Sequence, residues 1–176
     1  MAAIHICSLR LVEDLAATIK PSHVLSLLSG ITAFPPTPPG VDPANHLKLT
    51  LADISEPQSD MITPAADHVD EVIKFGRRWA AESGSTRPML VHCFAGISRS
   101  TASALTIACA LRPDVPDANF ANALRSASAS AQPNPLMINH ADDLLGRNGW
   151  LVSAVANMGA ADFSQAGHPF MLVLPG

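Results

Sequence analysis

The segment between Met89 and Leu111 constrains the fold most strongly. A short apolar run, Met89-Leu90-Val91, reaches a His-Cys pair, gives way to small and polar residues, and is followed by a long apolar stretch after Arg99. A run that is apolar on both faces is typical of a buried parallel strand, and the stretch after it is long enough for a buried helix. The segment therefore predicts a strand, a tight loop and a helix in succession.

The rest of the chain repeats this alternation. Strands are expected at Ile4–Cys7, in "HVLSLLS" and in "HLKLTL", which alternates polar and apolar residues, and a final strand is expected in the tail "HPFMLVLPG". Helices are expected from the Ser8 cap to Pro21, from Pro64 onward, and twice between Pro116 and Trp150 on either side of "QPNP". Strands that alternate with helices predict an α/β fold with a central, mainly parallel sheet of four to five strands covered on both sides.

The helix expected from Pro64 shows the clearest amphipathic pattern. Thr63 is its expected N-cap, and proline is tolerated at the first helical position. Its expected buried face comprises Val69, Val72, Ile73, Gly76, Trp79 and Ala80. Between the second and third strands, "FPPTPPGVDP" (residues 34–43) predicts a stiff irregular connection, because proline excludes regular structure.

Composition excludes several functional classes. The 176 residues favour one domain, residues 1–176, and a net charge of −4 with 11 Lys+Arg argues against nucleic-acid binding. Three widely spaced cysteines predict neither a disulfide framework nor a zinc site. The N-terminus lacks the pattern of a signal peptide, and no apolar run is long enough to span a bilayer, so a cytoplasmic protein without metal, cofactor or membrane partner is expected, with a monomer as the default.

The loop from Cys93 to Arg99 carries the candidate chemistry. It lies where α/β proteins bind ligands, beyond the carboxyl end of a strand and at a helix N-terminus. If the N–H groups of residues 94–99 point inward they form an anion cradle, in which Gly96 allows close approach and Arg99 adds a two-pronged donor. The same positive field predicts that Cys93 is a thiolate, placed to attack phosphorus.

At this point a family resemblance becomes specific. "HCFAGISRST" resembles the His-Cys-x-x-Gly-x-x-Arg-Ser/Thr signature of the protein-tyrosine-phosphatase superfamily, and its Ser-Arg-Ser ending is similar to the compact dual-specificity branch, in its bacterial type. The resemblance covers residues 4–150 and implies that branch's fold. Residues 151–176 form an extension of unknown role.

The resemblance also implies roles for the matched residues. Cys93 would form a phosphocysteine intermediate, and Ser100 would stabilise the departing thiolate. Arg99 and the loop residues Phe94, Ala95, Gly96, Ile97 and Ser98 would bind the phosphoryl group, with Phe94 at the mouth. His92 would brace the loop, and Asn134 in "QPNPLM" resembles an asparagine that supports it.

A general acid is needed to protonate the leaving oxygen. In the compact branch, by resemblance, an aspartate on a loop after the preceding strand supplies it. Here "LKLTLADISEP" ends a strand and places Asp53 about 40 residues before Cys93. Asp42, Asp60 and Asp67 are rivals, although Asp67 in a first helical turn is explained by the helix dipole alone.

The expected function is a cysteine-dependent phosphomonoester hydrolase, acting as a protein tyrosine or dual-specificity phosphatase. The chain has no Tyr, which the longer tyrosine-specific domains use to wall a deep pocket, so a shallow cleft is expected. Phosphoinositides are an alternative substrate. Phosphoinositide phosphatases that resemble this family often carry lysines in this loop, however, and "FAGIS" has none. A phospho-ligand-binding pseudophosphatase and a rhodanese-like sulfurtransferase are further alternatives. The first typically loses Cys or Arg, and the second usually has a loop one residue shorter.

Overall fold

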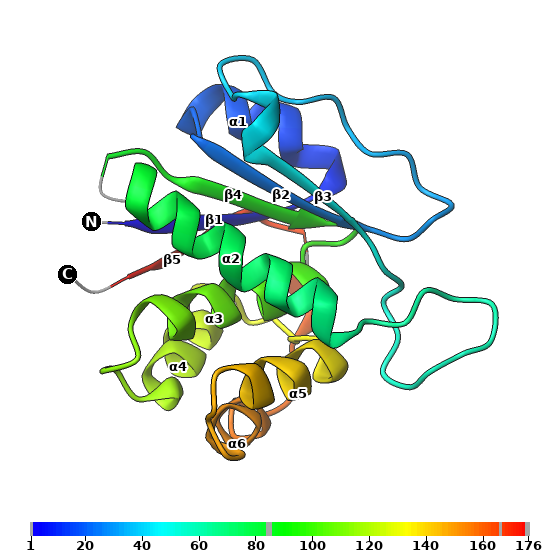
Figure 1. The fold of residues 1–176 in the computed structure, drawn as a ribbon, viewed down its shortest axis with the longest axis vertical. Helices are drawn as coiled ribbons and strands as arrows, with labels where there is room; N and C mark the ends of the chain where they lie inside the picture. Colours follow the sequence, from blue (N-terminus) through cyan, green and yellow to red (C-terminus); the bar gives the residue numbers. More distant parts are fainter. Residues whose placement is uncertain (1, 84–85, 166, 175–176) are drawn as a thin grey trace.

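The computed structural model describes residues 2–83, 86–165 and 167–174 and places a five-stranded sheet between two unequal layers of helices (Figure 1). The strands are β1 (Ala3–Ser8), β2 (His23–Leu28), β3 (His46–Thr50), β4 (Met89–Cys93) and β5 (Phe170–Val173). The α-helices are α1 (Val12–Ile19), α2 (Ala66–Glu82), α3 (Arg99–Leu111), α4 (Asp117–Ala127), α5 (Pro135–Leu144) and α6 (Trp150–Ala156). Three 3₁₀ turns lie at Leu9–Leu11, Pro43–Asn45 and Phe163–Gln165.

The sheet has the order β3-β2-β4-β1-β5. The first four strands in this order are mutually parallel, and β5 adds to β1 in antiparallel orientation. The α/β class and the mainly parallel sheet predicted from the sequence are confirmed, and so is the final strand in the tail, of which residues 175–176 lie outside the described residues. Because β4 is central, the loop that follows it opens at the middle of the sheet.

The two faces of the sheet are covered differently. Figure 1 shows α1 on one face and α2 to α6 on the other. On the α1 face a small cluster contains Val12 and Ala16 of α1, Val24 and Leu90 of the sheet, and Val41 of the proline-rich connection. The large core lies on the other face. The sequence predicted helices on both faces, and the structure shows that α1 shares one face with the loop at residues 34–43.

Helix α2 departs from its predicted start. It begins at Ala66, because its N-cap residue Ala65 is extended (φ −127°, ψ 165°), and the imidazole Nδ1 of His68 accepts the Ala65 N–H at 3.1 Å. The prediction that Thr63 caps a helix from Pro64 was therefore wrong by two residues. The prediction that Ser8 caps the first helix was also wrong, since its side chain makes no cap hydrogen bond and a 3₁₀ turn precedes α1.

The buried face of α2 is close to the predicted one. Ala80 is exposed and Phe75 is buried instead, because the Phe75 ring packs edge-on against His23 of β2 at 5.3 Å between centroids. Gly76 allows α3 to approach, since a Cβ there would lie 2.7 Å from a side-chain carbon of Ile107. Helix α3, with eleven buried residues, thereby becomes the centre of the helical layer.

The tail after α5 was only partly foreseen. Helix α6 begins at Trp150, where the sequence predicted the end of the last helix. None of the helices within the described ranges combines the length and the hydropathy that crossing a membrane requires.

Candidate active site

The carboxyl end of β4 places Cys93 at the floor of the loop Phe94–Ser98, and α3 begins directly at Arg99. This is the strand, loop and helix arrangement predicted from the sequence. Cys93 and Arg99 are both buried, whereas Phe94 and Ala95 at the top of the loop are exposed. The 61% exposed Phe94 ring is free to contact a bound molecule at the mouth.

Gly96 makes the curvature of this loop possible. Its φ of +75° is unfavourable for other residues, and a Cβ would lie 2.7 Å from the Cys7 carbonyl carbon and 2.8 Å from the Ser8 nitrogen. Its N–H points inward and donates to Cys93 Sγ at 3.2 Å. The loop thus carries at least one inward amide, as the predicted cradle requires.

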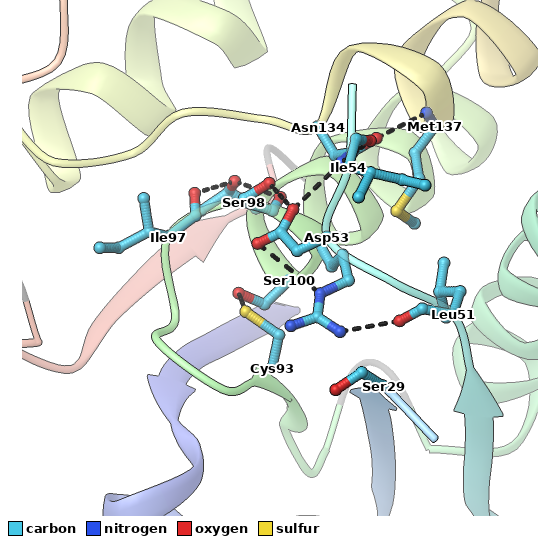
Figure 2. Close-up of polar contacts among 12 residues, drawn as sticks. Ser29, Leu51, Asp53, Ile54, Cys93, Ile97, Ser98, Ser100, Asn134 and Met137 are labelled. Atoms are coloured by element: carbon cyan, nitrogen blue, oxygen red, sulfur yellow. Dashed lines mark hydrogen bonds and ion pairs between the residues drawn. The ribbon is translucent and has the colours of Figure 1, made fainter. Parts of the chain in front are cut away.

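Cys93 Sγ has a second polar neighbour. Ser100 Oγ in the first turn of α3 lies 3.2 Å from it, as Figure 2 shows. Two hydrogen-bonding groups therefore surround the sulfur, together with the N-terminus of α3, and all three favour negative charge on it.

The other two cysteines lie in different environments. Burial raises the pKa of the Cys7 thiol to about 12, with a further increase from the nearby Cys93. Burial also raises the pKa of Cys109 far above its ordinary value, with a contribution from Asp117. Both stay protonated at neutral pH, as expected of small core side chains.

Arg99 lies buried in the first turn of α3, directly after the loop. One terminal nitrogen of its guanidinium donates to the Leu51 carbonyl oxygen at 2.8 Å and fixes the plane of the group. Within the described part of the chain, the buried Nε has no hydrogen-bond partner, and the carboxylate Oδ2 of Asp53 lies 3.7 Å away. A buried cationic donor without a partner is costly, so this nitrogen is suited to an anion that enters the loop.

Asp53 lies beside this donor. Its Oδ1 accepts hydrogen bonds from Ser98 Oγ at 2.5 Å and from Asn134 Nδ2 at 3.1 Å (Figure 2). The carboxylate is 36% exposed and therefore reachable from outside. Because two donors occupy Oδ1, the oxygen free to carry a proton is Oδ2, on the side of Arg99.

The rival aspartates lie elsewhere. Asp42 caps the turn at Pro43–Asn45 by accepting the Ala44 N–H at 2.9 Å. Asp60 is exposed in the loop before α2, and Asp67 occupies the first turn of that helix. Of the four candidates, Asp53 is the one that the structure brings to Arg99.

Asn134 joins three parts of the site. Its Oδ1 accepts the Met137 N–H at 3.2 Å and caps α5, while its Nδ2 donates to Asp53 and to the Ile54 carbonyl oxygen at 3.0 Å. Its backbone N–H donates to the Ser98 carbonyl oxygen at 3.3 Å. One side chain therefore holds the Asp53 segment, the loop and α5 in fixed positions.

His92 points to the opposite face of the sheet, because successive strand residues alternate. Its Nε2 lies 2.6 Å from Ser26 Oγ, which lies 2.8 Å from His46 Nε2, and His46 Nδ1 lies 2.9 Å from Thr37 Oγ1. Burial lowers the pKa of His92 to about 4 and that of His46 also to about 4, so both are neutral. These contacts connect the end of β4 to β2 and β3, and the bracing of the loop by His92 stays a prediction.

The partners in this chain of hydrogen bonds were not predicted from the sequence. A serine inside the apolar run "HVLSLL" was the available signal, since a buried hydroxyl requires a partner. Nothing local connected Ser26 to His46 or Thr37. No group of three His, Cys, Asp or Glu side chains placed to hold a metal ion occurs among the described residues.

Comparison with known proteins identifies the fold. No family model and no curated protein sequence matches the chain. Among solved structures it is similar to DUSP15, with a TM-score of 0.64 and 19% identity over 90% of this chain and 91% of that one. It is similar to human DUSP28, with a TM-score of 0.60 and 18% identity over 82% and 92% of the two chains. It is also similar to PTPMT1 in complex with PI(5)P, with a TM-score of 0.61 and 14% identity over 89% and 94%.

The chain therefore has the fold of the compact dual-specificity phosphatases, as the resemblance implied. At these identities the likeness establishes the fold, and the bacterial type of the resemblance stays a prediction.

Proposed function

We propose that the chain is a cysteine-dependent phosphomonoester hydrolase that acts on phosphorylated protein side chains through a phosphocysteine intermediate. The observation that carries the proposal is that one loop holds Cys93 Sγ, the inward Gly96 N–H that donates to it, and the buried Arg99, whose Nε makes no hydrogen bond among the described residues. A phosphoryl group placed there meets a nucleophile and donors for its oxygens together.

In the first step, Cys93 Sγ attacks phosphorus, the S–P bond forms and the bond from phosphorus to the leaving oxygen breaks. Asp53 Oδ2 faces this region, since Ser98 and Asn134 hold Oδ1 on the far side. The proton on Oδ2 passes to the leaving oxygen, and Asp53 becomes a carboxylate.

In the second step, a water molecule attacks phosphorus, its proton returns to Asp53, and the S–P bond breaks. The sulfur leaves as a thiolate. Ser100 Oγ and the Gly96 N–H, each 3.2 Å from the sulfur, stabilise that charge. Throughout, Arg99 and the loop amides hold the phosphoryl oxygens.

Phosphoinositides are a second candidate substrate class, because PTPMT1, whose fold the chain shares, was solved in complex with PI(5)P. The loop "FAGIS" contains no lysine to pair with further phosphates, which favours phosphorylated side chains.

The test is release of inorganic phosphate by the purified chain from an aryl phosphate, and from a panel of phosphotyrosine, phosphoserine and phosphothreonine peptides, phosphoinositides and nucleotides. We expect turnover of the aryl phosphate and of phosphopeptides that depends on Cys93. An absence of turnover on the whole panel would contradict the proposal.

A further inference from the structure

A groove of about 460 Å³ extends from the candidate site toward the C-terminal segment. Asp53, Ser98 and Asn134 line its inner end, and Val155, Ala156 and Met158 of the α6 region line its outer wall. The volume falls in the range of pockets that bind small ligands, and is larger than a phosphate alone requires.

The groove adjoins the phosphate cradle at Ser98 and Asp53, because Ser98 belongs to the loop and the Asp53 carboxylate lies 3.7 Å from Arg99 Nε. Figure 2 shows Asp53, Ser98 and Asn134 side by side above Cys93. A molecule whose phosphoryl group lies in the cradle can therefore extend the adjoining part of its structure along this groove.

The charge of the groove limits what that part can be. Arg125 is the only cation among the lining residues, all of which belong to the described chain. Its guanidinium makes four hydrogen bonds to backbone carbonyl oxygens: those of Ser128, Ala129, Met158 and Gly159. These bonds use four of the five N–H groups of an arginine, so Arg125 holds the tail in place and offers little to a second phosphate.

The surface of the groove suits a peptide. Ile54, Pro133, Pro135 and Val155 supply apolar walls, while the exposed Ser55 and Gln132 supply polar groups at the rim that can bond to a peptide backbone. Apolar walls with a few polar groups are typical of sites that take an uncharged side chain.

We propose that this groove binds the peptide segment next to the phosphorylated residue and accepts an uncharged apolar side chain from it. The proposal deepens the proposed function, on which it rests, by naming the substrate as a phosphopeptide with an apolar flanking residue. It also gives the C-terminal extension a role, since the α6 region forms the outer wall of the groove.

Binding is measured with the Cys93→Ser variant, so that the result does not depend on turnover. The probes are phosphotyrosine peptides in which every flanking residue is alanine except one. That one residue is leucine, glutamate or phosphoserine, and it is placed in turn at each of the two positions before and the two positions after the phosphotyrosine. Fluorescence anisotropy gives Kd for each peptide. At one position or more, leucine should bind about fivefold more tightly than alanine, as expected for a partly buried apolar side chain, and glutamate and phosphoserine should bind no better than alanine.

The groove is then filled with Ala156→Phe in the same background. Ala156 is exposed, so the larger side chain does not disturb the core, and retained folding is checked by thermal unfolding. The leucine preference should fall to within about twofold of unity, because the apolar wall is no longer accessible. Asn157→Phe is the matched control: the adjacent residue is exposed and lines the cavity between α4 and α6 instead. It should leave the preference unchanged.

A leucine preference that survives Ala156→Phe, or tighter binding of the phosphoserine peptides, would overturn the proposal. So would an inositol bisphosphate that binds more tightly than the leucine peptides and is weakened by Ala156→Phe. The proposed function fails separately, if the unmodified chain does not hydrolyse an aryl phosphate. The groove would then stand as a phosphopeptide-binding site without hydrolysis.

Discussion

Two adjacent residues at the end of β4 lie in opposite environments. His92 points to the α1 face, where Ser26, His46 and Thr37 complete a buried chain of neutral hydrogen-bonding groups. Cys93 points to the other face, where the Ser100 hydroxyl and the Gly96 N–H contact the sulfur and Arg99 lies buried in the first turn of α3. Both side chains are fully buried, so burial alone does not distinguish them.

The difference lies in the surrounding charge. On the histidine side burial keeps both imidazoles neutral. On the cysteine side the buried Arg99 Nε makes no hydrogen bond among the described residues and lies 3.7 Å from the Asp53 carboxylate, and α3 begins next to the loop, so positive groups lie near Cys93. The first arrangement links β4 to β2 and β3, and the second is suited to bind and attack an anion.

The largest expected effect comes from removing the sulfur. Cys93→Ser should abolish turnover of an aryl phosphate, because a serine hydroxyl is a much weaker nucleophile than a cysteine sulfur. The melting temperature should change little, since the serine fits the same space. Near-wild-type turnover in this variant would show that Cys93 is not the nucleophile and that the cysteine side of β4 is not the reactive one.

Arg99→Lys is the next most severe change. A point charge cannot replace the planar donor whose one end is fixed to Leu51 and whose Nε faces the site. We expect a loss of at least ~100-fold in kcat/KM, about 2.7 kcal/mol of transition-state stabilisation. An increase in KM with unchanged kcat would contradict a role in the transition state.

Asp53→Asn tests whether Asp53, on the cysteine side, supplies the proton that the leaving oxygen needs. Phenyl phosphate leaves as a poor phenoxide and should be hydrolysed roughly 100-fold more slowly, whereas a fluorinated coumarin phosphate needs less protonation and should lose much less. The basic limb of the pH–rate profile should flatten. Asp60→Asn and Asp67→Asn are the controls and should change neither rate. Equal slowing of both substrates by Asp53→Asn would place the acid elsewhere.

The histidine side should affect stability more than turnover. His46 has a pKa of about 4 when folded, below its ordinary value of 6.5, so the unfolded chain binds protons first as the pH falls. The contribution to the free energy of unfolding is complete above pH 6.5 and is lost between pH 6.5 and 4, approaching about 3 kcal/mol for each such histidine. Urea unfolding from pH 7 to pH 4 should show this decline.

In His46→Gln the decline should be smaller by the contribution of one histidine. The value of kcat/KM at pH 7 should change less than about tenfold, because His46 lies two hydrogen bonds from His92, through Ser26. If the free energy of unfolding had the same pH dependence in the variant and in the unmodified chain, His46 would not contribute to the decline. A ~100-fold loss of turnover would show that the two sides of β4 are not separate.

The sequence predicted the parts of the molecule that depend on short-range patterns. The strand, loop and helix around Cys93 could be recognised because a central parallel strand is apolar on both faces and the loop residues follow one another. Asp53 could be nominated by resemblance, because it follows a strand about 40 residues before Cys93, where the compact branch carries its aspartate. The contacts of Asn134 could not be predicted, since they join three segments far apart in the chain.

Longer-range features were not predictable for the same reason. His46 reaches Ser26 only once β2 and β3 are paired, and Thr37 in turn bonds to His46. Nothing in "FPPTPPGVDP" indicates a hydrogen bond to a histidine. Phe75 was left out of the expected helix face because its burial depends on His23 of another element. The wall formed by α6 depends on Arg125 bonding to Met158 and Gly159, which no local pattern indicates.

The most direct test of the central claim is to look for the covalent intermediate. The unmodified chain and Ser100→Ala are mixed with an aryl phosphate, quenched in acid within milliseconds, digested and analysed by mass spectrometry. Ser100→Ala should accumulate more intermediate, because the thiolate leaves without its hydroxyl donor at 3.2 Å. We predict a peptide that contains Cys93 and carries one additional phosphoryl group, absent from Cys93→Ser. Steady turnover with no phosphorylated Cys93 peptide in either protein, or with the phosphoryl group on another residue, would contradict the account.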